Sequence, residues 1–187
     1  MAAPPSVTMG NLGGTWVMSK TLSDDMGPSL ELQGMPWIIR KAVSFATITG
    51  KLSQTKNQDD VTCIQIAQTA TGGIKGETEV HKLDGKDYSH SSGVFGTQVV
   101  NTSWVHLKSE DSKVLKGWLR EDWLEGDDNA SPGNIHVSVK HDKAGWTAHQ
   151  VWGFAMVEGK RYFVKRFLVE KGSSDAKVRM VYEWKDV

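Results

Sequence analysis

The sequence has little cysteine and no excess of charge of either sign. Cys63 is the only cysteine among 187 residues, which excludes an internal disulfide and a cysteine-rich zinc site. Lysine plus arginine number 22 and aspartate plus glutamate also number 22, so no net field attracts nucleic acid or an anionic membrane. We therefore expect neither nucleic acid nor a membrane among the partners.

Targeting segments and common enzyme motifs are also missing. Residues 1–10 contain two prolines and no apolar run, unlike a signal peptide or membrane anchor. We predict that they form a flexible N-terminal arm of a cytoplasmic protein, followed by one domain over residues 11–187. The sequence has no Gly-x-Ser-x-Gly elbow, no His-Glu-x-x-His motif and no phosphate or dinucleotide loop. These absences argue against the usual hydrolases, kinases and dehydrogenases, and we expect neither a metal nor a cofactor.

Helical character is confined to a short stretch after the first predicted strand, residues 11–20. The oxygen side chains from Ser23 to Asp25 can accept free backbone amides, which predicts a helix that begins there and ends at Gln33. Over residues 37–46, apolar side chains recur every three or four positions, which predicts a second helix with one apolar face. We expect these two helices to form a short pair between the first two strands.

The rest of the chain alternates between apolar and polar residues and is interrupted by turn residues. Nine further strands are predicted, at residues 48–55, 60–69, 74–82, 97–107, 114–124, 134–141, 146–157, 161–170 and 177–185. Residues 126–133 are expected to form a solvated loop. Short hairpin connections favour a meander, and closure removes its exposed edges. The prediction is an all-β fold, a single up-and-down antiparallel β-barrel of about ten strands.

One hairpin shows which side chains share a face. A two-residue turn at residues 158–159 pairs Phe154 with Phe163 and Trp152 with Lys165, and paired residues lie on the same face. Adjacent residues point in opposite directions, so Lys165 and Arg166 cannot both lie outside the barrel wall. The pairing alone leaves open which of the two cations faces the lumen.

Both ends of the chain resemble intracellular fatty-acid-binding proteins. The matching residues are Gly14-Thr15-Trp16, Ser23-Asp24-Asp25, Gly34, Trp37 and Arg40-Lys41 at the start, and Glu158-Gly159-Lys160 and Val181-Tyr182-Glu183 at the end. The resemblance covers about the first 45 and the last 45 residues. It implies a calycin-like barrel that encloses a hydrophobic small molecule, with the aromatic face of the hairpin and therefore Lys165 inside.

Matching the last hairpin and the last strand to this family places a set of residues in the lumen. If the barrel is an enzyme, Lys165 and Tyr182 are its expected catalytic groups: a lysine in an apolar barrel loses its proton easily and can act as an acid or base, and either group can hydrogen-bond to substrate oxygens. The family's carboxylate-binding arginines correspond to Phe154 and Met180 here, so a free fatty acid is not the expected guest. The expected substrate-binding residues are Gln150, Trp152, Phe154, Met156, Phe163, Met180 and Trp184, with Arg40 over the barrel mouth.

A second resemblance covers residues 12–41 and rests on Thr15-Trp16, Ser23-Asp24-Asp25, Leu32-Gln33-Gly34, Trp37 and Arg40-Lys41-Ala42. In these residues the chain resembles small fungal lipocalin-like proteins that include hetero-Diels-Alderases of tropolone-sesquiterpene biosynthesis. This resemblance implies loss of water from a hydroxymethyl-tropolone and cycloaddition of the resulting quinone methide to a humulene-type olefin. Such a reaction needs no cofactor, because orientation of two apolar partners can itself supply roughly 7–11 kcal/mol.

Two other functions stay open. A non-catalytic carrier of a lipophilic molecule would use the same pocket. An interaction protein, or a homodimer, would need an exposed apolar outer face along residues 162–168. Six histidines at strand spacing are interpreted as solvated residues rather than metal ligands: His81, His90, His106, His136, His141 and His149.

Overall fold

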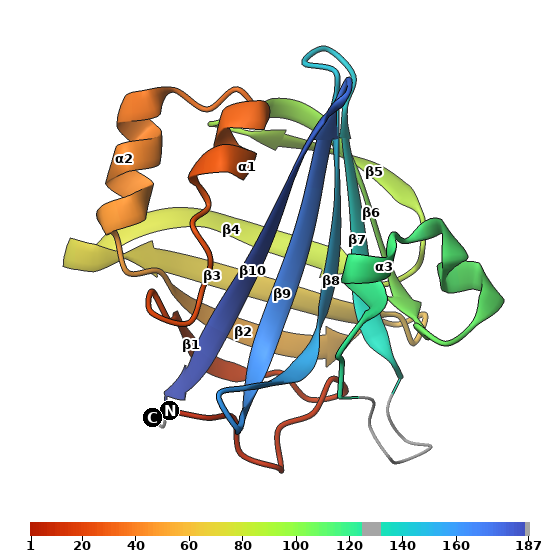
Figure 1. The fold of residues 1–187 in the computed structure, drawn as a ribbon. Helices are drawn as coiled ribbons and strands as arrows, with labels where there is room; N and C mark the ends of the chain where they lie inside the picture. The colour runs from red at the N-terminus through yellow and green to blue at the C-terminus, as the bar shows by residue number, and fades with distance from the viewer. Residues whose placement is uncertain (125–131, 186–187) are drawn as a thin grey trace.

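The computed structural model describes residues 1–124 and 132–185, where ten strands form one antiparallel sheet that curls into a nearly closed barrel (Figure 1). The strand order is β4-β3-β2-β1-β10-β9-β8-β7-β6-β5, so the first strand pairs with the last. The predicted up-and-down, all-β barrel is therefore confirmed. Most of the loop expected at residues 126–133 lies outside the described residues. The strands are β1 Gly14–Met18, β2 Thr49–Lys56, β3 Thr62–Ala70, β4 Ile74–Lys82, β5 Asp87–Ser92, β6 Gly96–Val105, β7 Asn134–His141, β8 Trp146–Val157, β9 Lys160–Lys171 and β10 Ser174–Lys185.

The barrel wall has one discontinuity, between β4 and β5. These strands are consecutive in sequence but lie at the two ends of the sheet order, so no ladder of backbone hydrogen bonds joins them. Side chains bridge them instead: the Tyr88 hydroxyl donates to the Val80 carbonyl oxygen at 3.0 Å, and the Gly93 amide donates to Glu77 Oε1. Side chains therefore close this part of the wall.

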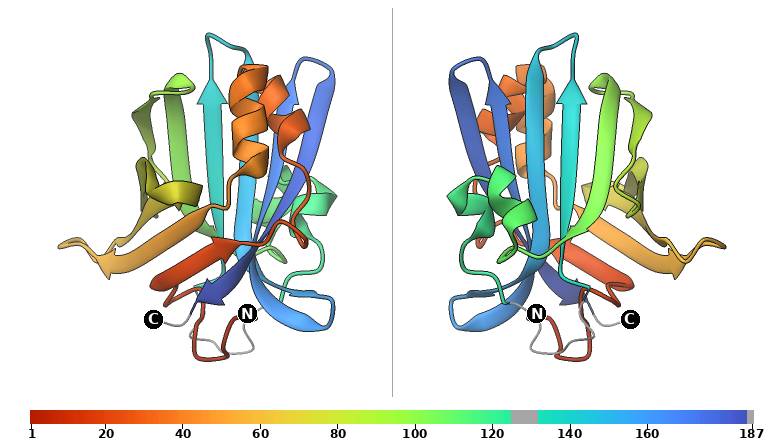
Figure 2. Two further views of the ribbon diagram at one scale, coloured as in Figure 1. Left: turned by 90° about the vertical axis from the view of Figure 1, so that its left-hand side faces the viewer. Right: turned by 90° about the vertical axis from the view of Figure 1, so that its right-hand side faces the viewer.

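Two helices, α1 Gly27–Leu32 and α2 Trp37–Phe45, lie over one end of the barrel, as expected between β1 and β2 (Figures 1 and 2). Helix α1 begins later than predicted, because Ser23 and Asp24 bind the edge of β10 rather than capping a helix. Ser23 Oγ accepts the Val181 amide at 2.9 Å, and Asp24 Oδ2 accepts the Arg179 amide at 2.7 Å. Along the described chain, we find no helix with the length and apolarity needed to cross a membrane.

The strand predicted at residues 114–124 is wrong. A 3-10 turn, η2 Glu110–Val114, and a short helix, α3 Gly117–Arg120, occupy this region and pack on the outside of β8 and β9. Leu115 and Leu119 from this region are buried in one outer cluster with Val151 of β8 and Leu168 of β9. The missing strand is β5, whose sequence Asp-Tyr-Ser-His-Ser-Ser lacks the apolar alternation that identified the others.

The outer face of β9 is covered by this helical segment. Arg166 lies beneath it and donates from Nη1 to the carbonyl oxygens of Trp118 and Glu121, at 2.8 and 2.6 Å. Tyr162 and Leu168 on the same face are buried as well. The chain itself therefore covers the apolar face along residues 162–168 that a homodimer was expected to use. The homodimer remains a prediction, but it would have to form through another surface.

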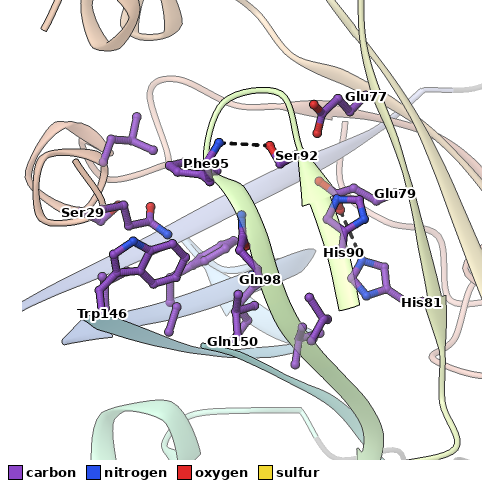
Figure 3. Close-up of a pocket in the computed structure, with 18 of the residues that line it drawn as sticks. Ser29, Glu77, Glu79, His81, His90, Ser92, Phe95, Gln98, Trp146 and Gln150 are labelled. Atoms are coloured by element: carbon purple, nitrogen blue, oxygen red, sulfur yellow. Dashed lines mark hydrogen bonds and ion pairs between the residues drawn. The ribbon is translucent and has the colours of Figure 1, made fainter. Parts of the chain in front are cut away.

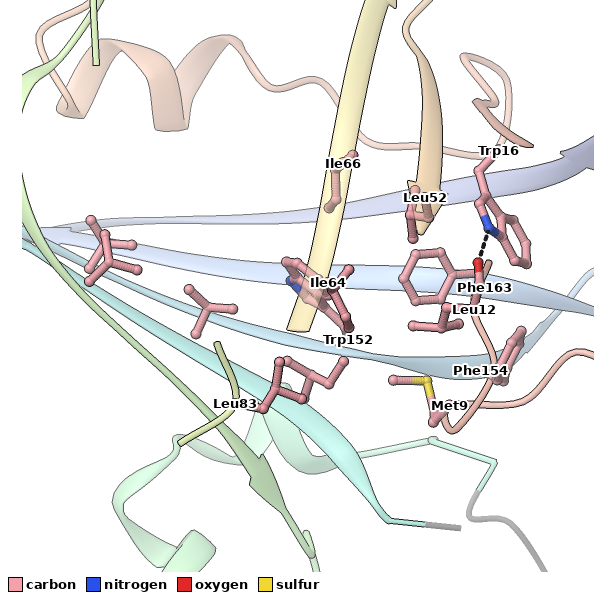
Figure 4. Packing of buried hydrophobic residues seen from close by; sticks show 14 of the residues in the cluster. Met9, Leu12, Trp16, Leu52, Ile64, Ile66, Leu83, Trp152, Phe154 and Phe163 are labelled. Carbon is pink, nitrogen blue, oxygen red and sulfur yellow. Dashed lines mark hydrogen bonds between the residues drawn. The ribbon is translucent and has the colours of Figure 1, made fainter. Parts of the chain in front are cut away.

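The barrel interior is filled at one end by large side chains (Figure 4). Trp16 packs against Phe163 and Phe154, with ring centroids 5.1 and 6.3 Å apart, and its Nε1 donates to the Leu12 carbonyl oxygen. Trp152 belongs to the same buried cluster. This end is solid core, so any space for a guest lies toward the helices.

The first ten residues pack against the solid end instead of forming the expected flexible arm. Their apolar side chains Ala3, Val7 and Met9 are buried in the main core cluster. Arg161 fixes the segment, because its guanidinium donates to the carbonyl oxygens of Pro4 and Val7 at 3.0 and 2.8 Å. Burial of three apolar side chains and two charge-assisted hydrogen bonds offset the entropy of ordering the segment.

We expect Gly153→Ala to lower the free energy of unfolding by about 2 kcal/mol, because the added methyl group overpacks β8. Its Cβ would lie 2.1 Å from Asn134 Nδ2 and 2.8 Å from the Trp123 ring. Chemical denaturation measures the change. Gly50→Ala is the control, since its Cβ meets Ile66 and Leu52 only at 3.4 Å. Equal effects of the two substitutions would contradict this packing.

Candidate functional site

A cavity of about 270 Å³ occupies the half of the lumen that the core leaves unfilled, beneath α1 (Figure 3). This volume is close to the lower end of small-molecule pockets, about 300 Å³. Helix α1 and all strands from β4 to β10 contribute to it. Its lining includes Ser29, Glu77, Glu79, His81, His90, Phe95, Gln98, Trp146, Gln150, Phe167 and Met180.

The cavity has two unlike walls. Figure 3 shows Glu77, Glu79 and His90 on the side of β4 and β5, whereas Phe95 and Trp146 lie on the opposite side. Phe95 and Trp146 meet edge to face, with ring centroids 6.0 Å apart. A guest therefore meets an aromatic surface on one side and titratable groups on the other.

The titratable wall is organised by hydrogen bonds around Glu79. Its Oε1 accepts from Gln68 Nε2 at 2.5 Å, and its Oε2 lies 3.3 Å from His81 Nε2. His81 Nδ1 lies 3.2 Å from Thr102 Oγ1, so a neutral His81 with its proton on Nε2 satisfies both contacts. Burial raises the pKa of Glu79, but the His81 hydrogen bond and the positive charge of Lys165 outweigh it and hold the pKa at about 2. Glu79 is an anion at neutral pH.

Lys165 lies inside the barrel, as the fatty-acid-binding resemblance implies. It exposes 6% of its surface, and its Nζ lies 3.6 Å from the Trp152 ring centroid. It is aligned with Trp152 on β8 and Met180 on β10, between the solid end and the cavity. Burial lowers the pKa of Lys165 to about 8, and the negative charge of Glu79 limits this decrease. Lys165 therefore lies just below the cavity lining.

Tyr182, the other expected catalytic group, lies beside Lys165 and is not part of the cavity lining. Its ring packs against Phe163 with centroids 5.6 Å apart, and its hydroxyl contacts Met180 Sδ at 3.8 Å. Burial raises the pKa of Tyr182 above its ordinary value, so the phenol stays protonated at neutral pH.

The other expected binding residues divide between the cavity and the core. Gln150 and Met180 line the cavity. Four aromatic residues instead pack at the solid end, where they set the depth of the cavity: Trp152, Phe154, Phe163 and Trp184.

Two expected binding residues lie elsewhere. Met156 was expected in the lumen, and this is wrong: its side chain is 53% exposed near the tip of the β8–β9 hairpin. The register was right, because Met156 pairs with Arg161 as predicted, but the Arg161 guanidinium covers the Phe154 ring at 3.5 Å and takes the inward position there. Arg40 pairs with Glu31 between the two helices at 2.8 Å.

Sequence reasoning missed the polar wall. Glu79 and His81 stand in a predicted strand, but alternation assigns polar residues to solvent. The available signal was the pairing with β3, where Ile66 is opposite Glu79 and Ile64 is opposite His81. Since paired residues share a face, two isoleucines that face the core bring these polar side chains inside with them.

The fold is a calycin-like barrel similar to those of solved fatty-acid-binding proteins. A Schistosoma mansoni fatty acid binding protein in complex with arachidonic acid matches with a TM-score of 0.58 at 14% identity, over 96% of this chain and 100% of that one. The REP1-NXSQ fatty acid transporter matches with a TM-score of 0.54 at 13% identity, over 94% of this chain and 97% of that one. No family model matches the sequence.

Sequence comparison identifies the family within this class. The pericyclase pydY of an Acremonium species is 30% identical over 185 residues, which cover 98% of this chain and 97% of the relative. The probable pericyclase scpY of Mollisia scopiformis is 27% identical over 184 residues, or 98% and 94% of the two chains. The chain belongs to the family of pydY and scpY.

The buried lysine makes a prediction about stability and pH. The pKa of Lys165 is about 8 in the folded chain and 10.5 in its ordinary state, so the unfolded chain binds more protons between these values. The free energy of unfolding should therefore rise with pH in this window, by about 2 kcal/mol from pH 8 to about pH 10. Urea unfolding at several pH values measures the rise.

The rise should disappear in Lys165→Met, which has no charge to lose. Lys177→Met, on the exposed face of β10, is the control and should keep the pH dependence of the unchanged protein. Equal pH slopes for Lys165→Met and the unchanged protein would contradict the buried position of the Lys165 ammonium group.

Proposed function

We propose that this protein is a pericyclase that holds apolar substrates in a reactive arrangement inside the barrel and needs no cofactor. The observation that carries the proposal is the match to pydY and scpY along nearly the whole chain. The cavity supports it, because aromatic side chains line one wall beneath a covering helix.

The chemistry follows from enclosure. A cycloaddition forms its new bonds in one step when both π-systems are held within reach, so the protein contributes mainly by restricting motion. Trp146 and Phe167 offer flat apolar surfaces against which an extended π-system stacks. Helix α1 covers the mouth and limits the access of water to a reactive intermediate.

In its specific form, the proposal is a hetero-Diels-Alder reaction between a tropolone quinone methide and a humulene-type olefin. The carbon–oxygen bond of a hydroxymethyl-tropolone breaks while the tropolone hydroxyl loses its proton, and the departing hydroxide and that proton leave together as water. The resulting quinone methide then adds to the olefin. Lys165 and Tyr182 act from the boundary of the cavity, where the Lys165 ammonium stabilises negative charge that develops on substrate oxygens.

A carrier without turnover is the second candidate, and the fatty-acid-binding type of fold favours it. The same cavity would then bind a lipophilic molecule and release it unchanged.

An assay with purified protein, a hydroxymethyl-tropolone and humulenol separates the two candidates. We expect the cycloadducts to form faster, and one of them to predominate more strongly, than with heat-inactivated protein. Chromatography with mass detection measures both the rate and the product distribution. Tight binding of either compound without acceleration would support the carrier. If the protein neither binds these two compounds nor accelerates their reaction, they are not its substrates.

Trp146→Ala should lower kcat/KM for the cycloaddition at least about tenfold, because the substrate loses a stacking surface that orients it. Trp37→Ala is the matched control: Trp37 lies on α2 and is 66% exposed, so turnover should change less than about twofold. Equal losses in the two variants would show that stacking on Trp146 does not orient the substrate.

A further inference from the structure

The cavity presents hydrogen-bond acceptors and two carboxylates but no lysine or arginine among its described lining residues. Lys165 lies below this lining, against the Trp152 ring, and Arg40 pairs with Glu31. A ligand at this site therefore touches the carboxylates of Glu77 and Glu79 directly, whereas the Lys165 charge acts on it only from below the lining.

Glu79 keeps free acceptor capacity toward the cavity. Each of its oxygens has one partner, Gln68 or His81, whereas a carboxylate offers about four acceptor positions. The side chain lines the cavity and retains 39% of its accessible surface. These contacts fix the carboxylate in place and leave it able to accept from a bound molecule.

Gln98 provides a second, independent sign of a polar ligand group. It is 7% exposed and lines the same cavity, and its side-chain amide has no hydrogen-bond partner in the described part of the chain. Gln150, which lines the same cavity (Figure 3), accepts from Trp152 Nε1 at 3.0 Å, so its NH₂ group is not used in that contact. An amide that lines a cavity and has no protein partner can bond to a polar group of a ligand there.

We propose that the cavity selects a mostly apolar ligand with a neutral hydroxyl or amide N–H group, which donates to Glu79 while Gln98 bonds to the same polar end, and that it rejects carboxylates. This inference rests on the proposed function only in that the cavity encloses an apolar molecule. It inverts the charge preference of a fatty-acid site, because Glu79 repels the head group that such a site attracts.

Three ligands with one chain length test the selectivity: decan-1-ol, decanamide and decanoic acid. Displacement of the neutral dye Nile red at pH 7.5 gives a Kd for each. We expect the alcohol and the amide to bind at least about tenfold more tightly than the acid, since like charges at a binding site cost more than that factor.

Glu79→Gln should tighten binding of decanoic acid by about tenfold and reduce the preference for the alcohol, because the amide retains the shape and loses the charge. Glu170→Gln is the matched control: Glu170 pairs with Lys116 outside the cavity lining, so the order of affinities should not change. Gln98→Leu should weaken binding of the alcohol and the amide by about tenfold without improving binding of the acid.

The outcomes separate this inference from the proposed function. If Nile red and all three ligands fail to bind, enclosure of an apolar molecule is itself refuted. If they bind with equal affinity, or if the acid binds most tightly, the inference fails while enclosure stands. Circular dichroism of each variant confirms that the barrel is intact.

Discussion

Alternation of side chains along β9 is the constraint on which the rest of the structure depends. Lys165 and Arg166 are neighbours in a wall strand, so they point to opposite faces, and both are buried. Each needs its own compensation. Lys165 lies over Trp152 on the inside and faces the charge of Glu79, whereas Arg166 bonds to carbonyl oxygens of the α3 segment on the outside. Lys165 thus places a charge inside the barrel, and Arg166 binds the helical segment to the outer wall.

The interior is divided by side-chain size. Successive inward positions of β8 carry Trp146, Ala148, Gln150, Trp152 and Phe154, so the two smaller side chains, Ala148 and Gln150, lie between the Trp146 wall of the cavity and the filled end. Trp16 from β1 completes the filled end. The cavity therefore lies where Ala148 and Gln150 leave space between large side chains, and its floor is part of the close-packed core.

The parts of the fold that depend on local geometry could be predicted from the sequence. Glu158 and Gly159 both have positive φ, as a two-residue hairpin turn requires, and this fixes the register of β8 and β9 that placed Trp152 beside Lys165. Residues whose burial depends on distant partners could not be predicted. Glu79 faces the interior because it pairs with the inward-facing Ile66 of β3. Leu119 is buried by packing against Val151 and Leu168, which are distant in sequence.

The discontinuity between β4 and β5 gives this part of the wall a different kind of link from the rest. Elsewhere, ladders of main-chain hydrogen bonds join neighbouring strands. At this seam, the described links are made by the Tyr88 hydroxyl and the Glu77 carboxylate, each on a rotatable side chain. Glu77 and Tyr88 also line the cavity, so the groups that close the wall here are groups that an enclosed molecule would touch.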